Sequence, residues 1–363
     1  MTETLDMVPD SFEPLLPSPE PVPGYEGLLV TVTGATGLIG SHVVEVLKHS
    51  GARVRGILHR RPRTGPPGVM PDEVRSADLL VPEQALDAVR GSDVVLSCAG
   101  ITGGVGLAGK DPVSFVGPAT VIAMNALHAC WLAKIPRIGY LSSTTVYPPL
   151  DRPAVEGDSQ LPDPLYPLYR GIGESKRFME RLLAYYRDTT SIGAAIVRPS
   201  GAYGCADNFD EGTSHVLPAM IARALRLRAG EPFEVWGDGR DVRDLVHARD
   251  VARCLLLATV HPQADLKTGG ATGGQQAGPF NASSGTGIST GDLARMVLDA
   301  VGVRADIVFR PDRPSALKTR LVSSAKAEAV LGWRPEISLR RGIADVVESR
   351  KRALRGLLDW RSP

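Results

Sequence analysis

The stretch Val30-Thr31-Val32-Thr33-Gly34-Ala35-Thr36-Gly37-Leu38-Ile39-Gly40 decides how the rest of this chain folds. A β-branched apolar run turns there directly into closely spaced glycines and then into a helical pattern of valines and leucines. Glycine lets the backbone turn sharply and approach a pyrophosphate, and the following helix presents free N–H groups and its positive dipole end. The stretch therefore predicts a strand–turn–helix unit that binds a dinucleotide. The residues expected to bind it are Gly34, Thr36, Gly37, Leu38, Ile39 and Gly40.

Length and composition limit the class of protein. The 363 residues suffice for a dinucleotide-binding domain with a smaller second lobe, and a net charge of +1 argues against a nucleic-acid surface. We expect no membrane span, because the apolar runs fall short of roughly 18 residues. The four cysteines lack metal-ligand spacing and the N-terminus has no apolar signal core, so we expect no metal site and a cytoplasmic location.

The chain divides into three parts. Residues 1–27, rich in Pro, Glu and Asp, predict an extended or disordered arm. Residues 28–206, with part of 240–262, predict an α/β domain with a Rossmann-type doubly wound parallel sheet. Residues 207–363 predict mainly a smaller C-terminal lobe that binds substrate, with a loop in the Gly/Thr/Gln-rich stretch 266–278.

The end of the second predicted strand, residues 53–58, bears on the choice of dinucleotide. NAD sites place a carboxylate there for the ribose hydroxyls, but this chain has His59-Arg60-Arg61. Guanidinium groups suit a 2′-phosphate, so Arg60 and Arg61 favour NADP over NAD. The alternative is that both arginines are solvated loop charges. Asp78 and Leu79, after a further short strand, are expected to border the adenine.

Several motifs downstream fall in a recognisable order and spacing. They are Leu141-Ser142-Ser143-Thr144-Thr145-Val146-Tyr147, Lys176, Arg198-Pro199 and Tyr203-Gly204, with supporting stretches at residues 99–104, 125–129, 208–219 and 235–247. Over nearly its whole length the chain resembles the extended short-chain dehydrogenase/reductase family, the NAD-dependent epimerases and dehydratases. Within it the chain looks most like the GDP-fucose synthase and GDP-mannose 3,5-epimerase branch. The resemblance implies an NAD(P)-bound enzyme, acting on a nucleotide-diphosphate sugar, that forms a homodimer through helices that include the one bearing Lys176.

The resemblance also implies catalytic roles. Ser143 matches the hydroxyl that aligns the sugar, and Lys176 matches the lysine that binds the nicotinamide ribose and lowers the pKa of a nearby tyrosine. Pro199 matches a cofactor contact. Thr145 and His215 stand where the branch places an acid/base pair, a cysteine and a histidine. Of these two only His215 is able to exchange protons near neutral pH.

One departure from the family matters more than the matches. The catalytic tyrosine that the family places four residues before the lysine is replaced by Ile172, which cannot carry a proton. Tyr169 is one substitute, because seven residues span about 700° of helix and bring it within roughly 20° of the face of Lys176. A second interpretation gives the proton to another group or to water. A third has no hydride chemistry and makes the chain a binding protein.

Substrate recognition is expected mainly from the C-terminal part. Arg223 and Arg243 match substrate-contacting positions of the branch, and Asn208 lies in a matching stretch. Trp236 offers a flat apolar face to the base or the sugar. Cys205 replaces a proline of the branch, and is interpreted either as a small buried side chain or as a replacement acid/base.

Taken together, these features predict an NAD(P)-dependent nucleotide-sugar epimerase, acting on a GDP-sugar through a transient keto-sugar. A dehydratase or 4-reductase on the same class of substrate is the alternative enzyme. A cofactor-retaining binding protein, motivated by Ile172, is the alternative from another class.

Overall fold

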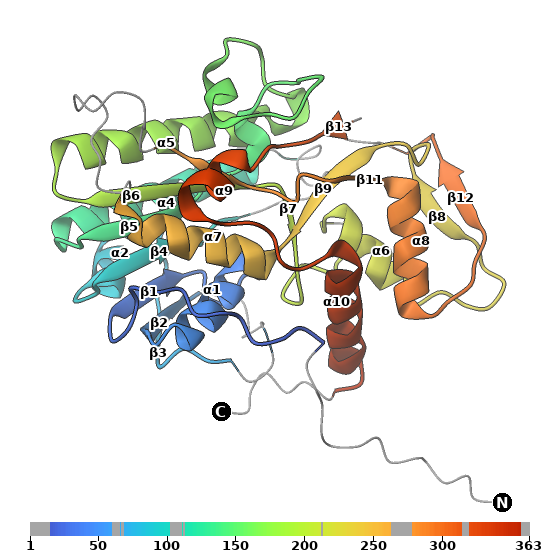
Figure 1. Ribbon diagram of the computed structural model, residues 1–363, viewed down its shortest axis with the longest axis horizontal. Coiled ribbons are helices and arrows are strands. Elements are labelled where there is room, and N and C mark those ends of the chain that lie inside the picture. Colours follow the sequence, from blue (N-terminus) through green and yellow to red (C-terminus); the bar gives the residue numbers. More distant parts are fainter. Residues whose placement is uncertain are drawn as a thin grey trace, which may run out of the picture.

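A computed structural model describes residues 15–59, 66, 69–101, 111, 113–211, 213–262, 278–313 and 319–356. Its centre is a sheet of seven strands, all parallel to their neighbours (Figure 1). The strand order is β10 (Phe280–Ala282), β6 (Gly193–Pro199), β5 (Arg137–Leu141), β4 (Val94–Ser97), β1 (Leu29–Thr33), β2 (Arg53–Leu58), β3 (Glu73–Ser76). The predicted doubly wound Rossmann-type α/β fold is confirmed.

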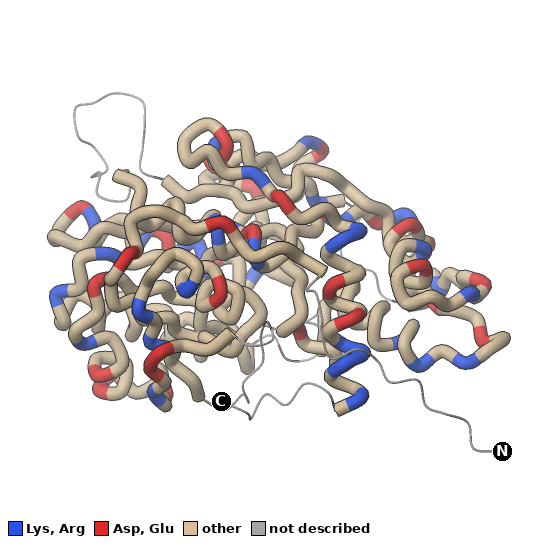
Figure 2. The backbone as a smooth tube through the Cα atoms, turned by 60° about the horizontal axis from the view of Figure 1, so that its bottom comes forward, with Lys and Arg blue, Asp and Glu red and all other residues tan. Residues whose placement is uncertain are grey.

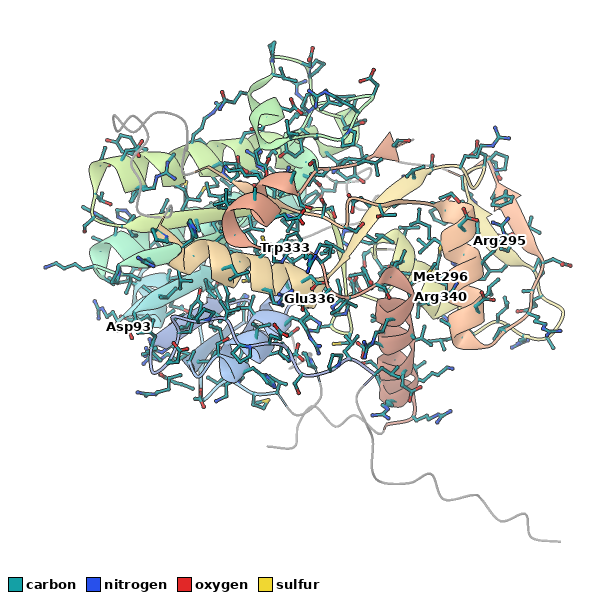
Figure 3. The ribbon with its side chains drawn as sticks, in the orientation of Figure 1. Asp93, Arg295, Met296, Trp333, Glu336 and Arg340 are labelled. Carbon is teal, nitrogen blue, oxygen red and sulfur yellow. The ribbon has the colours of Figure 1, made fainter. Side chains whose placement is uncertain are left out.

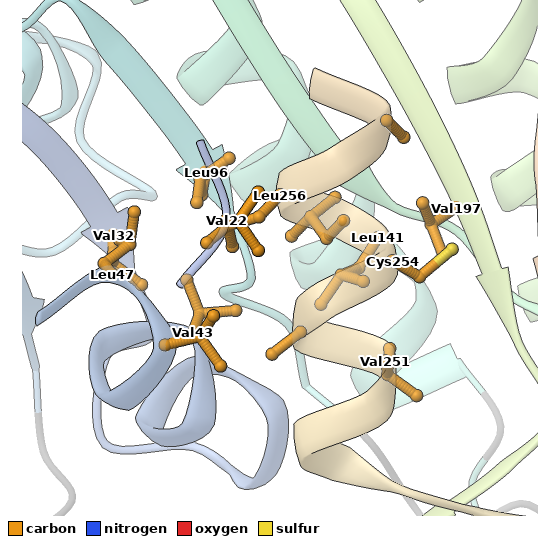
Figure 4. Packing of buried hydrophobic residues seen from close by; sticks show 14 of the residues in the cluster. Val22, Val32, Val43, Leu47, Leu96, Leu141, Val197, Val251, Cys254 and Leu256 are labelled. Carbon is orange, nitrogen blue, oxygen red and sulfur yellow. The ribbon is translucent and has the colours of Figure 1, made fainter. Parts of the chain in front are cut away.

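Helices cover both faces of this sheet. One face carries α1 (Leu38–His49) and α7 (Ala248–Val260). The other carries α2 (Pro82–Val89), α4 (Val113–Leu132) and α5 (Arg170–Thr189). Figure 4 shows the first layer, where Val43 and Leu47 of α1 and Leu256 of α7 pack against Val32 of β1. Because both faces are covered, the strands are apolar on both sides, as a parallel sheet requires.

The order of the strands reverses beside β1. The chain passes from β1 to β2 on one side, and β4 then pairs with the other side of β1. In doubly wound sheets, ligands bind at the carboxyl ends of the strands where the order reverses. The glycine turn after β1 and the segments after β4, β5 and β6 therefore meet at the edge where a ligand is expected.

The second lobe has its own small sheets and core. A four-stranded sheet contains β9 (Val242–His247), which pairs with β7 (Gly201–Tyr203), β11 (Gly287–Ser289) and β13 (Thr319–Arg320). Two more strands, β8 (Phe233–Trp236) and β12 (Ile307–Arg310), pair with each other. Three helices pack on them: α6 (Val216–Ala224), α8 (Thr290–Val301) and α10 (Leu339–Leu354). Figure 2 shows acidic and basic residues mixed along the chain, with several Lys and Arg on α10.

The division between the lobes is less simple than the sequence predicts. The strand β10 and the helix α9 (Ala325–Leu331), both expected in the second lobe, return to the large sheet. Trp333, after α9, is fully buried, and its Nε1 donates to the Asp250 carbonyl at 2.9 Å (Figure 3). The last strand of the Rossmann sheet is thus supplied by the C-terminal third of the chain.

The described part of the N-terminal arm is packed on the domain. Residues 15–27 form no helix or strand, but Leu16, Val22 and Tyr25 are buried. The Tyr25 hydroxyl donates to the Leu256 carbonyl at 2.9 Å, and Arg249 donates to the Pro17 carbonyl at 2.6 Å. These residues of the predicted arm are thus held against the domain by buried side chains and hydrogen bonds. Residues 1–14 lie outside the described residues.

The helix α4 corrects one expectation. Its 20 residues have a mean hydropathy of 1.4, so by length and composition it is able to cross a membrane, and the statement that no apolar run is long enough is wrong here. In the fold, α4 lies in the layer between α2 and α5, and Leu127 and Cys130 are buried there. Trp131 and Leu132, at its end, are exposed.

Candidate active site

The glycine turn after β1 is so tight that side chains are excluded from it. Gly34 has a φ of +64°, and a Cβ there would lie 2.8 Å from the Ala99 Cα. A Cβ on Gly40 would overlap the Gly34 carbonyl oxygen. Only glycine meets both conditions, which is why this sequence makes a strand-to-helix turn at this point.

The start of α1 suits the pyrophosphate of a dinucleotide. Gly37 is the N-cap of α1 and forms no side-chain capping hydrogen bond. The first turn of the helix holds no acidic residue. The N–H groups and positive dipole end of the helix are therefore left for an anion. Thr36, Leu38 and Ile39 lie in or next to this turn. The residues present fit an NAD(P) molecule, and the individual contacts remain predictions.

The adenosine end of the predicted cofactor site is described in part. Arg60 and Arg61 lie outside the described residues, so the basis for preferring NADP rests on sequence. His59 Nε2, just before them, lies 3.6 Å from an Asp78 carboxylate oxygen. The Leu79 carbonyl accepts from Asn125 of α4 at 2.8 Å. The segment that holds Asp78 and Leu79 therefore borders the end of β2.

Ser143 and Lys176 come together at the end of β5. Ser143 caps a short 3₁₀ turn, η1 (Thr144–Val146), and its Oγ accepts from the Thr145 N–H at 3.1 Å. Lys176 Nζ donates to the Leu141 carbonyl at 2.9 Å and to the Tyr140 hydroxyl at 3.1 Å. The lysine is thus anchored two residues before the serine. Ser143, Lys176 and Pro199, at the end of the adjacent strand β6, share one edge of the sheet.

Glycine also sets how closely α5 approaches this segment. A Cβ on Gly173 would lie 2.5 Å from the Thr145 carbonyl oxygen and 2.6 Å from a Leu165 methyl carbon. The helix therefore rests directly on the turn after Ser143. Ile172, one residue earlier in the first turn of α5, is partly buried and supplies no proton-carrying group.

A buried polar network lies beneath the site. Arg198 of β6 is 2% exposed and pairs with Glu180 of α5 at 2.6 Å. Arg198 also donates to the Tyr147 hydroxyl at 2.8 Å, and that hydroxyl donates to Asn281 of β10 at 2.6 Å. Burial raises the pKa of Tyr147 to about 12, against the opposing effect of Arg198. Tyr147 therefore stays protonated and links strands, and sequence reasoning did not find this network.

Tyr169 is placed by an arginine that sequence reasoning missed. The guanidinium carbon of Arg320, on β13, lies 5.1 Å from the centre of the Tyr169 ring and 5.6 Å from that of Tyr166. Arg320 also donates to Thr144 Oγ1 at 3.4 Å, next to Ser143. Tyr169 therefore lies near the Ser143 segment, as the substitute role requires.

The argument from helical phase, however, is wrong. Tyr169 ends the 3₁₀ turn η3 (Pro167–Tyr169), and α5 begins only at Arg170. The position of its ring is set by Arg320, not by the helix that bears Lys176.

Arg320 has unused hydrogen-bonding capacity. Its Nε is buried without a hydrogen-bond partner in the described part of the chain, and burial lowers the pKa of its guanidinium. It pairs in register with Arg243 of β9, so two cations lie side by side at this edge of the second lobe. Two adjacent guanidinium groups are a suitable partner for a diphosphate.

The two acid/base positions of the branch differ in chemistry. His215, the N-cap of α6, reaches solvent, yet desolvation by the surrounding protein lowers the pKa of its imidazole. It is therefore a neutral ring at neutral pH, able to accept a proton. Thr145 Oγ1 is buried and has no hydrogen-bond partner among the described residues. Threonine does not ionise in this range, so His215 alone of this pair can exchange protons.

The four expected substrate residues are not equally accessible. Asn208 is tied into its own loop, donating to Thr213 at 2.8 Å, and Arg223 donates to the Glu234 carbonyl at 2.9 Å. Trp236 is 46% exposed. Arg243 lies 3.4 Å from Asp241 and is partly exposed. The geometry favours Trp236 and Arg243 as substrate contacts over Asn208 and Arg223.

The fold and this edge define a class of protein: a Rossmann enzyme with a serine–lysine pair beside a dinucleotide turn, completed by a second lobe. The comparison with known families agrees. The chain belongs to the NAD dependent epimerase/dehydratase family, which it matches over residues 30–270.

Curated relatives are similar at low identity over most of their length. A GDP-L-fucose synthase of Sinorhizobium fredii is 24% identical, covering 89% of this chain and 96% of the relative. A dTDP-4-dehydro-6-deoxy-D-allose reductase of Streptomyces bikiniensis is 27% identical, covering 88% and 95%. GDP-mannose 3,5-epimerase of Arabidopsis thaliana is 26% identical, covering 88% and 81%.

Solved structures share the fold. The epimerase Mth375 of Methanothermobacter thermautotrophicus superposes with a TM-score of 0.77 at 21% identity, covering 92% of this chain and 95% of its own. A Thermus thermophilus UDP-glucose 4-epimerase in complex with NAD gives 0.71 at 25% identity, covering 89% and 99%. The expected family, the Rossmann fold and the enzymatic nature of the chain are therefore confirmed.

Proposed function

We propose that this chain is an NAD(P)-dependent nucleotide-sugar epimerase that withdraws and returns a hydride at one sugar carbon, through a transient ketone. The observation that carries the proposal is the placement of Ser143 and Lys176 on one edge of the sheet with the glycine turn. The relatives named as GDP-sugar enzymes support a GDP-sugar as substrate.

Different residues perform different parts of the proposed reaction. A bound nicotinamide supplies the acceptor and donor of the hydride. Ser143 Oγ hydrogen-bonds the reacting hydroxyl and holds the sugar in place, and Lys176 fixes the cofactor ribose from its anchor on β5. Arg243 and Arg320 bind the diphosphate, so that both ends of the substrate are fixed relative to the hydride.

A group must also take the hydroxyl proton as the ketone forms. Tyr169 performs this step in the proposal, because its ring lies beside Arg320, which also contacts Thr144 next to Ser143. Return of the hydride to the opposite face of the ketone then inverts the carbon, and the same tyrosine gives the proton back. This series of steps consumes no cofactor.

A reductase that acts on a 4-keto sugar is the second candidate. Thr145 favours it, because a threonine at that position removes one member of the acid/base pair needed to invert carbons beside the ketone. A dehydratase would instead eliminate water from the keto-sugar.

One incubation separates these reactions. Purified protein is mixed with oxidised or reduced nicotinamide cofactor and a panel of GDP- and UDP-sugars, including 4-keto-sugars, in D₂O, and the products are followed by mass spectrometry and sugar NMR. An inverted carbon without change of mass supports hydride withdrawal and return at that carbon. Loss of water identifies a dehydratase, and a gain of two hydrogens on a keto-sugar identifies a reductase. No change across the panel supports a binding protein.

His215 gives a separate prediction about protons beside the ketone. If it exchanges such a proton, His215→Gln should lower deuterium incorporation from D₂O at least about tenfold, while hydride transfer persists. Because its pKa is lowered, incorporation by the parent should be constant near neutral pH and fall only in more acidic buffer. Equal incorporation in parent and variant would contradict this role. His128→Gln, on the exposed side of α4, is the matched control.

Cofactor preference is tested by the arginines after β2. We expect NADP to bind more tightly than NAD, and Arg60→Ala with Arg61→Ala to weaken NADP at least about tenfold while changing NAD little, since only NADP carries the 2′-phosphate. Isothermal titration calorimetry measures the affinity for NAD and the affinity for NADP. Equal affinities for NAD and NADP in the parent would show that the arginines are solvated loop charges.

The homodimer also remains a proposal. The resemblance places α5, the helix that bears Lys176, in a dimer interface, and α4 packs beside it. The proposal is supported by exposed apolar side chains on these two helices: Met124, Trp131, Leu132, Phe178 and Tyr185. A second copy that covers this face would remove them from water.

A further inference from the structure

Cys205 lies at the head of a chain of interacting side chains that the proposed reaction does not use. It follows β7, is partly exposed, and its Sγ lies 3.8 Å from Nε2 of His42. The other ring nitrogen of His42 lies 2.7 Å from a carboxylate oxygen of Glu45, three residues further along α1. Arg249 holds the Glu45 carboxylate with donors at 2.6 Å and 3.1 Å. Thiol, imidazole and carboxylate are thus arranged in series.

The backbone brings the thiol to the histidine. A Cβ on Gly204 would lie 3.1 Å from His42 Nε2 and 3.2 Å from a Leu38 methyl carbon. Glycine therefore allows the end of β7 to approach the side of α1. On α1 itself, the spacing of three residues puts Glu45 on the same face as His42. The arrangement is built by three separate elements, α1, α7 and the segment after β7.

The charges around His42 favour its protonated form. The titratable groups that face it are Cys205, Glu45, Arg249, His247 and Asp345. Burial opposes the charge on His42, but Cys205 and Glu45 outweigh it and raise the pKa of His42 to about 10.

The second histidine, His247, favours the neutral form. The His247 ring lies edge-on to His42 with centroids 5.1 Å apart. Its pKa is lowered well below the ordinary value, first by burial and then by the charges of His42 and Arg249. His247 therefore stays neutral beside a positively charged His42.

We propose that Cys205 and His42 form a reactive thiol–imidazole pair, a modification site that reacts with small electrophiles, of which hydroperoxides are the natural class. A thiolate is the reactive form of cysteine, and an adjacent protonated histidine stabilises it. The Cys205 thiolate attacks one oxygen of the peroxide, the O–O bond breaks, and the leaving oxygen takes the His42 proton. Sulfur is oxidised to a sulfenic acid and the peroxide is reduced to water or an alcohol.

The chain supplies an internal comparison. Cys98, after β4, is also partly exposed, but burial of its thiol raises its pKa, and its Sγ forms no hydrogen bond with a histidine in the described part of the chain. Cys130 and Cys254 are buried. The reactivities of all four thiols can therefore be compared in the same sample.

The experiment measures alkylation of each cysteine by iodoacetamide, in which the thiolate displaces iodide, across buffers from about pH 5.5 to 9. Peptide mass spectrometry gives a rate for each site. We expect Cys205 to react at least about tenfold faster than Cys98 at pH 6, with a rate that changes little with pH, because an ordinary thiol loses about tenfold per pH unit below 8.5. A Cys205 rate that rises with pH like an ordinary thiol would overturn the proposal.

Variants and a second reagent complete the test. His42→Gln should restore the ordinary pH dependence of Cys205, whereas His128→Gln should not. Thermal unfolding shows whether each variant is folded, and the pH profile of the parent decides the question if His42→Gln is not. After hydrogen peroxide, a dimedone adduct should form on Cys205 and be absent in Cys205→Ser. Failure of the parent to form this adduct would also overturn the proposal.

Discussion

Gly37→Val should weaken the binding of NAD(P) at least about a hundredfold while the protein stays folded. Gly37 begins α1, and a Cβ there would lie 3.2 Å from the Gly34 carbonyl oxygen, so the branched side chain must point to the side where the pyrophosphate is expected. Loss of two or three charge-assisted bonds to that group corresponds to about 3 kcal/mol. Calorimetric titration with NAD and with NADP measures the loss.

The control introduces the same glycine-to-valine substitution at a position away from the expected cofactor site. Gly117 lies on the exposed side of α4, and apart from its chain neighbours and the backbone of its own helix, no atom of the described residues lies within 4 Å of where its Cβ would stand. Gly117→Val should bind NAD(P) like the parent. Parental affinity in Gly37→Val would place the cofactor elsewhere.

Tyr169→Phe should lower turnover by about 10² or more with little change in the affinity for substrate. General-base catalysis of this kind is typically worth about 10²–10⁴ in rate, and Phe keeps the ring against Arg320 while it removes the hydroxyl. Steady-state kinetics on the substrate identified by the panel separates kcat from KM.

Two further variants identify the cause of that loss. Tyr166→Phe removes a hydroxyl from the other ring beside Arg320 and should leave turnover close to that of the parent. Arg320→Met should reduce turnover, and Arg320→Lys should recover part of it, because lysine keeps the charge. Unchanged turnover in Tyr169→Phe would assign the proton to His215, to Cys205 or to water.

The parts of this molecule that sequence predicts well are those set by local physics. The turn at Gly34, Gly37 and Gly40 depends on steric limits within a few residues, and the predicted strand and helix are β1 and α1. The end of α9 likewise depends on local physics, because Gly332 takes a φ of +64° there.

The parts that sequence misses depend on contacts between distant segments. Arg320 lies on a strand of two residues, too short for any periodicity, and packs on Tyr169, which stands 151 positions earlier in the sequence. The pair of Arg198 and Glu180 joins a strand to a helix, and no local pattern marks it. Residues 15–27 are held in place by the buried side chains of Leu16, Val22 and Tyr25. The spacing of these three residues in the sequence matches neither the period of a helix nor that of a strand.

For Tyr169, the sequence-based argument and the structure differ in their reason for naming it. The helical count assumed that α5 extends back to residue 169, but the helix begins at Arg170. The tertiary contact with Arg320 nevertheless brings Tyr169 near the segment of Ser143.

The most direct test of the central claim is a balance of cofactor against product. The protein, its cofactor and a converted nucleotide sugar are incubated together, while reduced nicotinamide is followed by absorbance and the sugar by NMR. The account predicts many turnovers of inverted sugar for each cofactor molecule, with no net change in reduced nicotinamide. One molecule of cofactor oxidised or reduced for each sugar converted would contradict it.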